Sequence, residues 1–95
     1  MPRRPIHPGE FLYEELKELD VSAAELARRI HVPANRISQI LAGKRNVSAD
    51  TALRLGRWFG TGPQIWLNLQ QAYELDLARE EMGDELARIE PRAAA

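Results

Sequence analysis

The stretch from Ala34 to Leu41 carries polar side chains that could form hydrogen bonds with the edges of planar groups such as nucleic-acid bases. These polar residues are Asn35, Arg36, Ser38 and Gln39. An Asn or Gln amide can form two hydrogen bonds with adenine, whereas an Arg guanidinium can bind guanine or clamp a phosphate. Ser38 could contact either a base or a phosphate, and Ala34 could touch only a thymine methyl group. The residue types favour contacts with nucleic acid, and for Arg36 we slightly prefer a phosphate.

The charges of the chain are segregated, although its formal net charge at pH 7 is only −1. No Asp or Glu occurs from Leu26 to Ala49, where the basic residues are Arg28, Arg29, Arg36, Lys44 and Arg45. A basic stretch that coincides with the polar segment is typical of a nucleic-acid surface. Phosphate contacts give affinity and register, and we assign them within this stretch. The residues assigned to the DNA backbone are Arg28, Arg36, Lys44 and Arg45.

The sign of the charge reverses toward the C-terminus. The acidic residues there are Glu74, Asp76, Glu80, Glu81, Asp84, Glu85 and Glu90. Two regions of opposite charge favour two partner surfaces. For the acidic end alone, an ordinary solvated helix face is an equally good interpretation.

Other kinds of site have little support in the sequence. The chain has no Cys and only two histidines, His7 and His31, so we expect no metal site. Glu14, Glu15 and Glu18 would share one polar helix face without a nucleophile or a histidine beside them, so we expect neither catalysis nor a cofactor. There is no run of eighteen apolar residues and no signal segment, which favours a cytoplasmic protein with no membrane contact.

Two short helices with a tight turn at His31–Pro33 would position the polar segment. Ser22 is a good N-cap for the first helix, and Glu25 stands three residues later, which is the spacing of a capping box. Free N–H groups at a helix N-terminus favour anions, so we add Ser22 and Ala23 to the phosphate contacts. In the second helix one face is apolar, and its residues are Ile37, Ile40 and Leu41.

Three further helices are expected around this pair. The first would start at Pro8 with His7 as its cap, the fourth would follow Ser48 and end at Gly60, and the fifth would contain Pro63 in its first turn. The large aromatic residues of the last two helices have helical spacing and are expected mainly in the core. They are Trp58, Phe59, Trp66 and Tyr73.

The organisation we predict is a single all-α domain with an arm and an extension. The arm is 1–7, the helix-turn-helix domain is 8–73 with its motif at about 23–42, and the acidic helical extension is 74–95. A lone amphipathic helix of this kind is marginal in water, so a second copy of the chain is its simplest partner. The residues predicted at this dimer contact are Trp66, Tyr73, Leu75, Met82, Leu86 and Ile89.

The segment from Ser22 to Ala42 resembles the helix-turn-helix of the Xre/Cro type. Counted from Ala23, the small residue at the fifth place is Ala27, and the ninth place, usually Gly, is His31, which tolerates positive φ better than most residues. The apolar places are Leu26, Ile30, Val32, Ile37 and Ile40. The resemblance implies a compact five-helix, lambda-repressor-like domain with an additional C-terminal helix and with the second motif helix in the major groove. It assigns base reading to Ala34, Asn35 and Gln39, and Ser38 lies between them.

A wider resemblance covers about Pro5 to Leu77. The runs PIHPGEFL, ISQILAGKRNVSADTALRLGRWFG and QIWLNLQQAYEL are similar to those of HigA-type antitoxins, the antidotes of HigB–HigA toxin–antitoxin modules. This resemblance implies a homodimer that binds operator DNA, represses its own operon and neutralises a HigB-like toxin. In that family the toxin is an mRNA-cleaving ribonuclease.

Two alternatives stay open at this point. A stand-alone regulator of phage or metabolic origin would have the same motif but no toxin encoded beside it. An interaction module that has lost DNA contact would also keep the fold, although the stretch without carboxylates from Leu26 to Ala49 counts against it.

Overall fold

The computed structural model describes residues 4–93, which form five α-helices and one 3-10 turn. Their bounds are α1 (Pro8–Leu19), α2 (Ala23–Arg29), α3 (Ala34–Leu41), α4 (Ala49–Phe59), α5 (Gln64–Met82) and η1 (Leu86–Arg88). No strand occurs between residues 4 and 93. The all-α class with a helix-turn-helix is confirmed, whereas residues 1–3 of the expected arm lie outside the described residues.

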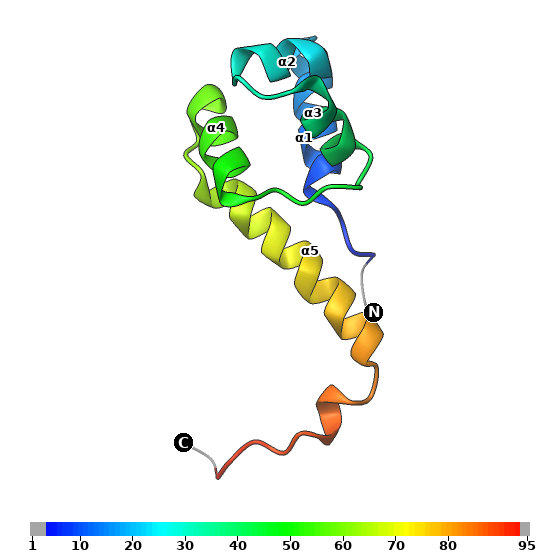
Figure 1. The fold of residues 1–95 in the computed structure, drawn as a ribbon. Coiled ribbons are helices and arrows are strands. Elements are labelled where there is room, and N and C mark those ends of the chain that lie inside the picture. Colours follow the sequence, from blue (N-terminus) through cyan, green and yellow to red (C-terminus); the bar gives the residue numbers. More distant parts are fainter. Residues whose placement is uncertain (1–3, 94–95) are drawn as a thin grey trace.

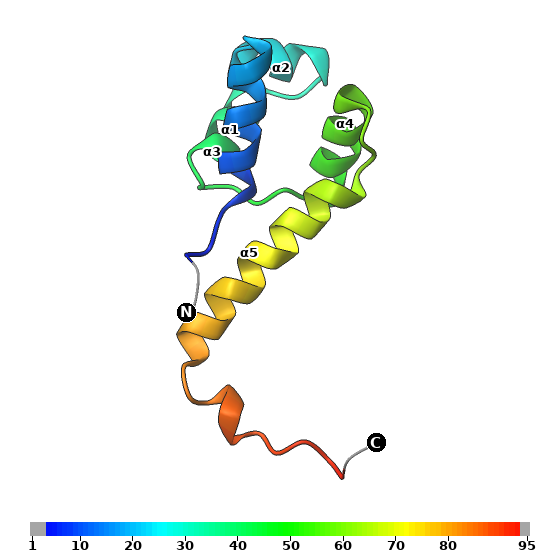
Figure 2. The ribbon, with the colours of Figure 1, turned by 180° about the vertical axis from the view of Figure 1, so that it is seen from behind.

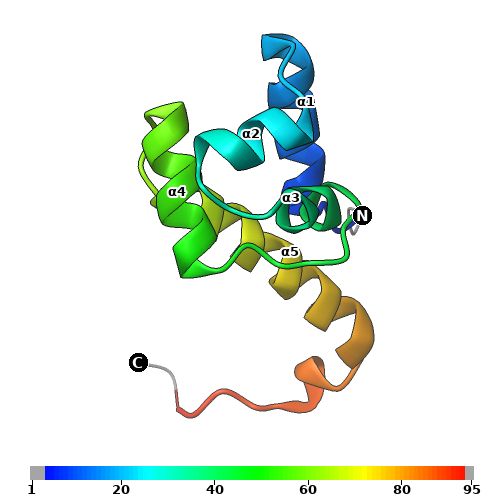
Figure 3. The same ribbon diagram turned by 45° about the horizontal axis from the view of Figure 1, so that its top comes forward.

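The first four helices form a compact group, and α5 extends from it (Figures 1 and 2). The helix pairs with the most extensive contacts are α1 with α3, α2 with α3, α4 with α5 and α1 with α5. Figure 3 shows α2 between α1 and α4, with α3 beside it. Because only the first half of α5 lies under this group, the molecule is elongated, with extents of 52 × 25 × 22 Å.

The core is built from the apolar positions of the motif and from the helices around it. Its buried apolar residues are Leu12, Leu16, Leu26, Ala27, Ile30, Ile37, Ile40, Val47, Ala52, Leu55 and Trp66. The indole of Trp66 lies against the rings of Phe11 and Phe59, with centroids 5.4 Å away in both cases. This corrects the expectation that Trp66 forms a dimer contact, because its side chain is 1% exposed and is covered by its own chain.

The helix starts follow the local signals in the sequence. The hydroxyl of Ser22 accepts a hydrogen bond from the Glu25 N–H at 3.1 Å, and the hydroxyl of Ser48 accepts one from the Thr51 N–H at 3.3 Å. At the start of α1, the Nδ1 atom of His7 accepts a hydrogen bond from the Gly9 N–H at 2.9 Å. Each bond satisfies a backbone donor that has no partner within its helix.

The C-terminal part of the chain differs from the expected extension. Residues 74–82 are the second half of α5, so no break separates them from the preceding domain. The helix ends at Met82 and is followed by Gly83, whose φ is 54°; of the described residues after it, up to residue 93, only the single turn η1 is helical. The additional C-terminal helix is therefore the projecting half of α5 rather than a separate element.

Candidate nucleic-acid interface

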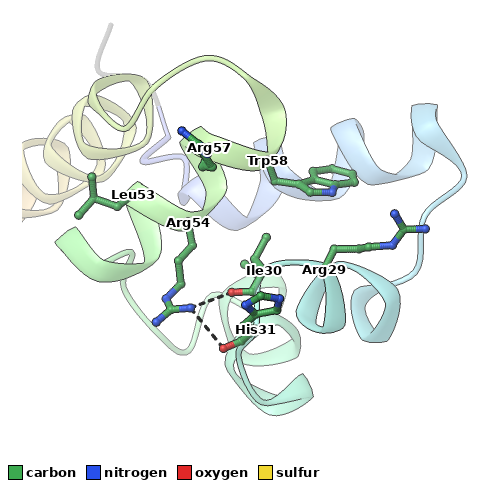
Figure 4. A pocket seen from close by; sticks show the side chains of 7 residues that line it. All are labelled: Arg29, Ile30, His31, Leu53, Arg54, Arg57 and Trp58. Atoms are coloured by element: carbon green, nitrogen blue, oxygen red, sulfur yellow. Dashed lines mark hydrogen bonds between the residues drawn. The ribbon is translucent and has the colours of Figure 1, made fainter.

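The turn between α2 and α3 places His31, which stands where the motif usually has Gly, in the left-handed conformation. The φ of His31 is 63°, a region that non-glycine residues adopt uncommonly, with His among the more tolerant. Arg54 of α4 holds this turn, since its Nη1 donates to the carbonyl oxygens of Ile30 at 2.9 Å and His31 at 3.3 Å (Figure 4). The hydrogen bonds fix the angle at which α3 leaves α2.

The polar face of α3 points outward because its apolar face is anchored in the core. Ile37 and Ile40 are both 0% exposed. Ala34, Asn35 and Ser38 are exposed, and the Ser38 hydroxyl donates to the Asn35 carbonyl oxygen at 3.3 Å. The structure thus leaves the first turn of α3 accessible to a partner.

Gln39 lies at the end of the same face and is joined to the loop after α3. The Nε of Arg45 donates to the Oε1 of Gln39 at 2.9 Å. This bond occupies the amide oxygen of Gln39. Arg45 therefore helps to orient the side-chain amide of Gln39, including its NH₂ group. The sequence assigned one residue to bases and the other to phosphates, and the structure brings the two side chains together.

Arg36 is held by a carboxylate that the sequence analysis did not place in the site. Its Nη1 lies 2.7 Å from the Oδ2 of Asp50, and the Nε of Arg54 lies 3.0 Å from the same oxygen. Hydrogen bonds from Arg54 and then from Arg36 lower the pKa of the Asp50 carboxyl. Asp50 stands alone as a carboxylate from residue 26 to residue 73, and this isolation is the signal that could have found it.

The start of α2 offers fewer free charges than expected. The carboxylate of Glu25 pairs with Arg28 and with the Nε of Arg29, the latter at 2.6 Å. The hydrogen bond from Arg29 is the largest cause of the lowered pKa of Glu25. Arg28 is therefore a paired side chain here, although 69% of it remains exposed.

The remaining predicted backbone contacts lie on exposed or partly exposed parts of the surface. Lys44 is exposed in the loop after α3, Ser22 is exposed and Ala23 is half-buried. A shallow pocket of about 290 Å³ is lined by residues that include Ser22, Ala23 and Leu41, so the start of α2 lies near the end of α3.

A second pocket lies behind the turn, between the end of α2 and α4 (Figure 4). Its volume is about 320 Å³, and its lining residues are Arg29, Ile30, His31, Leu53, Arg54, Arg57 and Trp58. Arg54 crosses this pocket to reach the carbonyl groups of the turn. The pocket therefore contains one of the side chains that connect α4 to the helix-turn-helix.

The residues predicted at a dimer contact have different exposures. Tyr73 is half-buried and its ring packs edge-on against His7, with centroids 4.9 Å apart. The exposed residues are Leu75 (54%), Met82 (37%), Leu86 (49%) and Ile89 (61%). These four side chains form an apolar set on the projecting part of the chain.

Residues 4–93 offer neither a metal-binding group nor a membrane-spanning helix. From residue 4 to residue 93, no group of three or more His, Cys, Asp or Glu side chains is placed to hold a metal ion. In the same range, none of the helices has the length and apolar character needed to span a bilayer.

Comparison with known proteins identifies the family. The helix-turn-helix family model matches residues 12–66, more than half of the chain. A HigA-family addiction module antidote protein from Coxiella burnetii superposes with a TM-score of 0.90 at 49% identity, over 94% of this chain and 99% of that one. The chain belongs to the HigA-type helix-turn-helix family. The resemblance noted in the sequence is thereby confirmed.

Two other similar proteins match most of the chain. The antitoxin HigA of Pseudomonas aeruginosa, solved with the higBA promoter, has a TM-score of 0.87 and 47% identity over 94% of this chain and 99% of that one. Virulence-associated protein I of Dichelobacter nodosus is 51% identical over 77 residues, which are 80% of this chain and 71% of that protein. The likeness to these proteins extends beyond the helix-turn-helix motif.

Proposed function

We propose that this chain is a sequence-specific DNA-binding antitoxin of the cytoplasm that represses its own operon. The observation that carries the proposal is the exposed polar turn of α3, anchored from behind by Ile37 and Ile40. Asn35 and Gln39 would read base edges, with Ala34 and Ser38 beside them. The structure of the P. aeruginosa HigA with the higBA promoter supports DNA binding by this chain.

The DNA backbone would be held by residues around that turn. Ser22 and Ala23 at the start of α2 would offer N–H groups to one phosphate. Lys44 and Arg45 would contact phosphates from the loop after α3, and Arg28 would add charge from α2. Each phosphate neutralised would make the logarithm of the binding constant fall by about 0.9 per log unit of salt.

The proposal includes a homodimer, since helix-turn-helix proteins bind two half-sites about one helical turn apart. The exposed apolar set Leu75, Met82, Leu86 and Ile89 would supply the contact, with Tyr73 at its edge. Each of these residues is between 37% and 61% exposed in the described part of the chain, so an isolated chain would leave much of their apolar surface in water.

The second partner in the proposal is a HigB-like toxin, an mRNA-cleaving ribonuclease in that family. The family relationship supports it, and so does the acidic end of the chain, which complements a basic RNA-binding protein. A regulator without a toxin is the alternative, and it would use the same DNA surface.

Two measurements test the proposal. Fluorescence anisotropy with the duplex immediately upstream of the chain's own coding sequence should show tighter binding than a shuffled duplex of equal composition. Co-expression with the product of the adjacent gene should give a stable complex on size exclusion. Equal binding to both duplexes would reject sequence-specific repression, whereas a missing complex would leave a stand-alone regulator.

A further inference from the structure

Asp50 is an exception within a basic stretch of the chain. Between residues 26 and 73 it is the only acidic residue. The basic residues of the same stretch are Arg28, Arg29, Arg36, Lys44, Arg45, Arg54 and Arg57. A carboxylate on a surface that binds phosphates weakens binding by charge repulsion. We therefore ask which other contacts Asp50 makes at this position.

The contacts of Asp50 show which side chains it controls. One oxygen, Oδ2, lies 2.7 Å from the Nη1 of Arg36 on α3 and 3.0 Å from the Nε of Arg54 on α4. Arg54 also donates to the carbonyl groups of Ile30 and His31 in the turn (Figure 4). A continuous set of hydrogen bonds thus connects the turn and the first turn of α3 to α4.

The ion pair changes what Arg36 can contact. Its side chain is 27% exposed, whereas that of Arg28 is 69% exposed. To bind a phosphate, the Arg36 guanidinium would have to leave a carboxylate that it already contacts at 2.7 Å. A duplex of any sequence would then gain one cationic contact, but α3 would lose its link to α4.

We propose that Asp50 is a specificity-determining residue of DNA recognition, which retains Arg36 against α4 and so withholds it from the phosphates of random DNA. This inference rests on the proposed function. The pairing keeps α3 at a fixed angle for reading bases and lowers the sequence-independent part of the affinity. Asp50 is a positioning residue, since it acts through Arg36 and Arg54 and not through its own contact with bases.

The test compares wild type with Asp50→Asn, which removes the charge but keeps the size of the side chain. The probes are the upstream duplex and its shuffled counterpart, each titrated at several salt concentrations. In the variant, the salt slope for the shuffled duplex should steepen by about 0.9, the value for one more phosphate contact. The ratio of upstream to shuffled affinity should fall about tenfold, because random binding gains a contact while the reading angle is lost.

Two further variants separate this role from a general one. Glu18→Gln removes one exposed carboxylate from α1 and should leave both the ratio and the slope at wild-type values. Combining Asp50→Asn with Arg36→Gln should return the salt slope to that of wild type or below it, since Arg36 is the side chain released. Thermal unfolding of each variant verifies that it is folded.

The outcomes discriminate between the two proposals. A wild-type protein that binds both duplexes equally rejects the proposed function and this inference with it. A wild-type protein that discriminates, together with an Asp50→Asn variant of unchanged ratio and slope, rejects the inference alone. A parallel loss of affinity for both duplexes would likewise reject it, because Asp50 would then act only on the stability of α4.

Discussion

Gly9 in α1 lies directly against the backbone carbonyl of Ile40 in α3, with no space between them for a side chain. A methyl group at Gly9 would come within 1.9 Å of the Ile40 carbonyl oxygen. The preceding residues set up this approach, since His7 caps α1 and Pro8 occupies its first position. The run His-Pro-Gly therefore places α1 on the helix that carries the candidate base-reading residues.

Replacing Gly9 with Ala should destabilise the fold through this contact. The added methyl group would force α1 away from α3, at a cost of about 1–3 kcal/mol or more in the free energy of unfolding. Urea denaturation followed by circular dichroism measures this difference.

Gly60→Ala is the matched control for that substitution. Gly60 has φ of 79°, but no atom lies within 4 Å of the added carbon. It should cost only the backbone strain of about 1–2 kcal/mol expected for a left-handed non-glycine residue. If Gly9→Ala cost no more than Gly60→Ala, the close approach of α1 and α3 would be contradicted.

His7 should make stability depend on pH in the mildly acidic range. Burial is the main cause that lowers its pKa, against smaller opposite effects of the Arg45 backbone and of Glu10. Since the unfolded chain has a histidine pKa of about 6.5, it binds more protons than the folded chain just below that pH. The free energy of unfolding should therefore fall as the pH is lowered from about 7 through 6.5, until the lower folded pKa is passed.

Chemical denaturation at a series of pH values measures this fall, and two variants assign it. His7→Asn keeps a good N-cap without an imidazole, and its stability should be nearly independent of pH in that range. His31→Asn retains His7 and a residue that tolerates the left-handed turn, so the fall should persist. If the free energy of unfolding of His7→Asn still fell over this pH range, the pH dependence would belong to another titratable group.

Asn35 and Lys44 should differ in the kind of DNA contact that they make. Asn35→Ala should weaken binding to the upstream duplex by about 1–3 kcal/mol and relax the preference at one base position. Lys44→Ala should weaken binding to upstream and shuffled duplexes alike and reduce the salt slope by about 0.9. Anisotropy titrations with single-base variants of the duplex distinguish the two patterns.

The assignments would be reversed by the opposite pattern. A loss confined to the upstream duplex for Lys44→Ala would place that side chain among the base readers. An unchanged affinity and base preference for Asn35→Ala would remove Asn35 from them.

Removing the exposed apolar set should prevent the proposed dimer. A chain that ends at Met82 keeps all of α5 but lacks Leu86 and Ile89, and one that also carries Leu75→Lys and Met82→Lys lacks all four apolar contacts. The truncated chain with both lysine substitutions should be a monomer by size exclusion with light scattering. The chain that is only truncated should have a dimer dissociation constant between those of the full chain and of the lysine variant. A dimer that persisted in the second variant would place the contact on another surface.

The local features of this protein follow from its sequence. The caps at His7, Ser22 and Ser48 depend on side chains that bond N–H groups two or three residues away, so their spacing suffices to predict them. The buried positions of α2 and α3 follow from helical periodicity. At His31 the residue departs from the Gly usual in the motif, and the structure shows that it nevertheless adopts positive φ. The polar face of α3 also follows from helical periodicity, and the family was predictable from runs of the sequence that resemble those of HigA-type antitoxins.

The tertiary structure decided which of these residues meet. Arg36 and Asp50 are fourteen positions apart, and the Val47 N–H donates to the side-chain oxygen of Gln70 twenty-three positions away. Neither contact could be predicted from local residue spacing. Trp66 has the same aromatic character as an interface residue, and only the packing of Phe11 and Phe59 around it makes it core. The crossing angles of the helices determine these contacts, and they arise from the packing of the whole core rather than from any single segment.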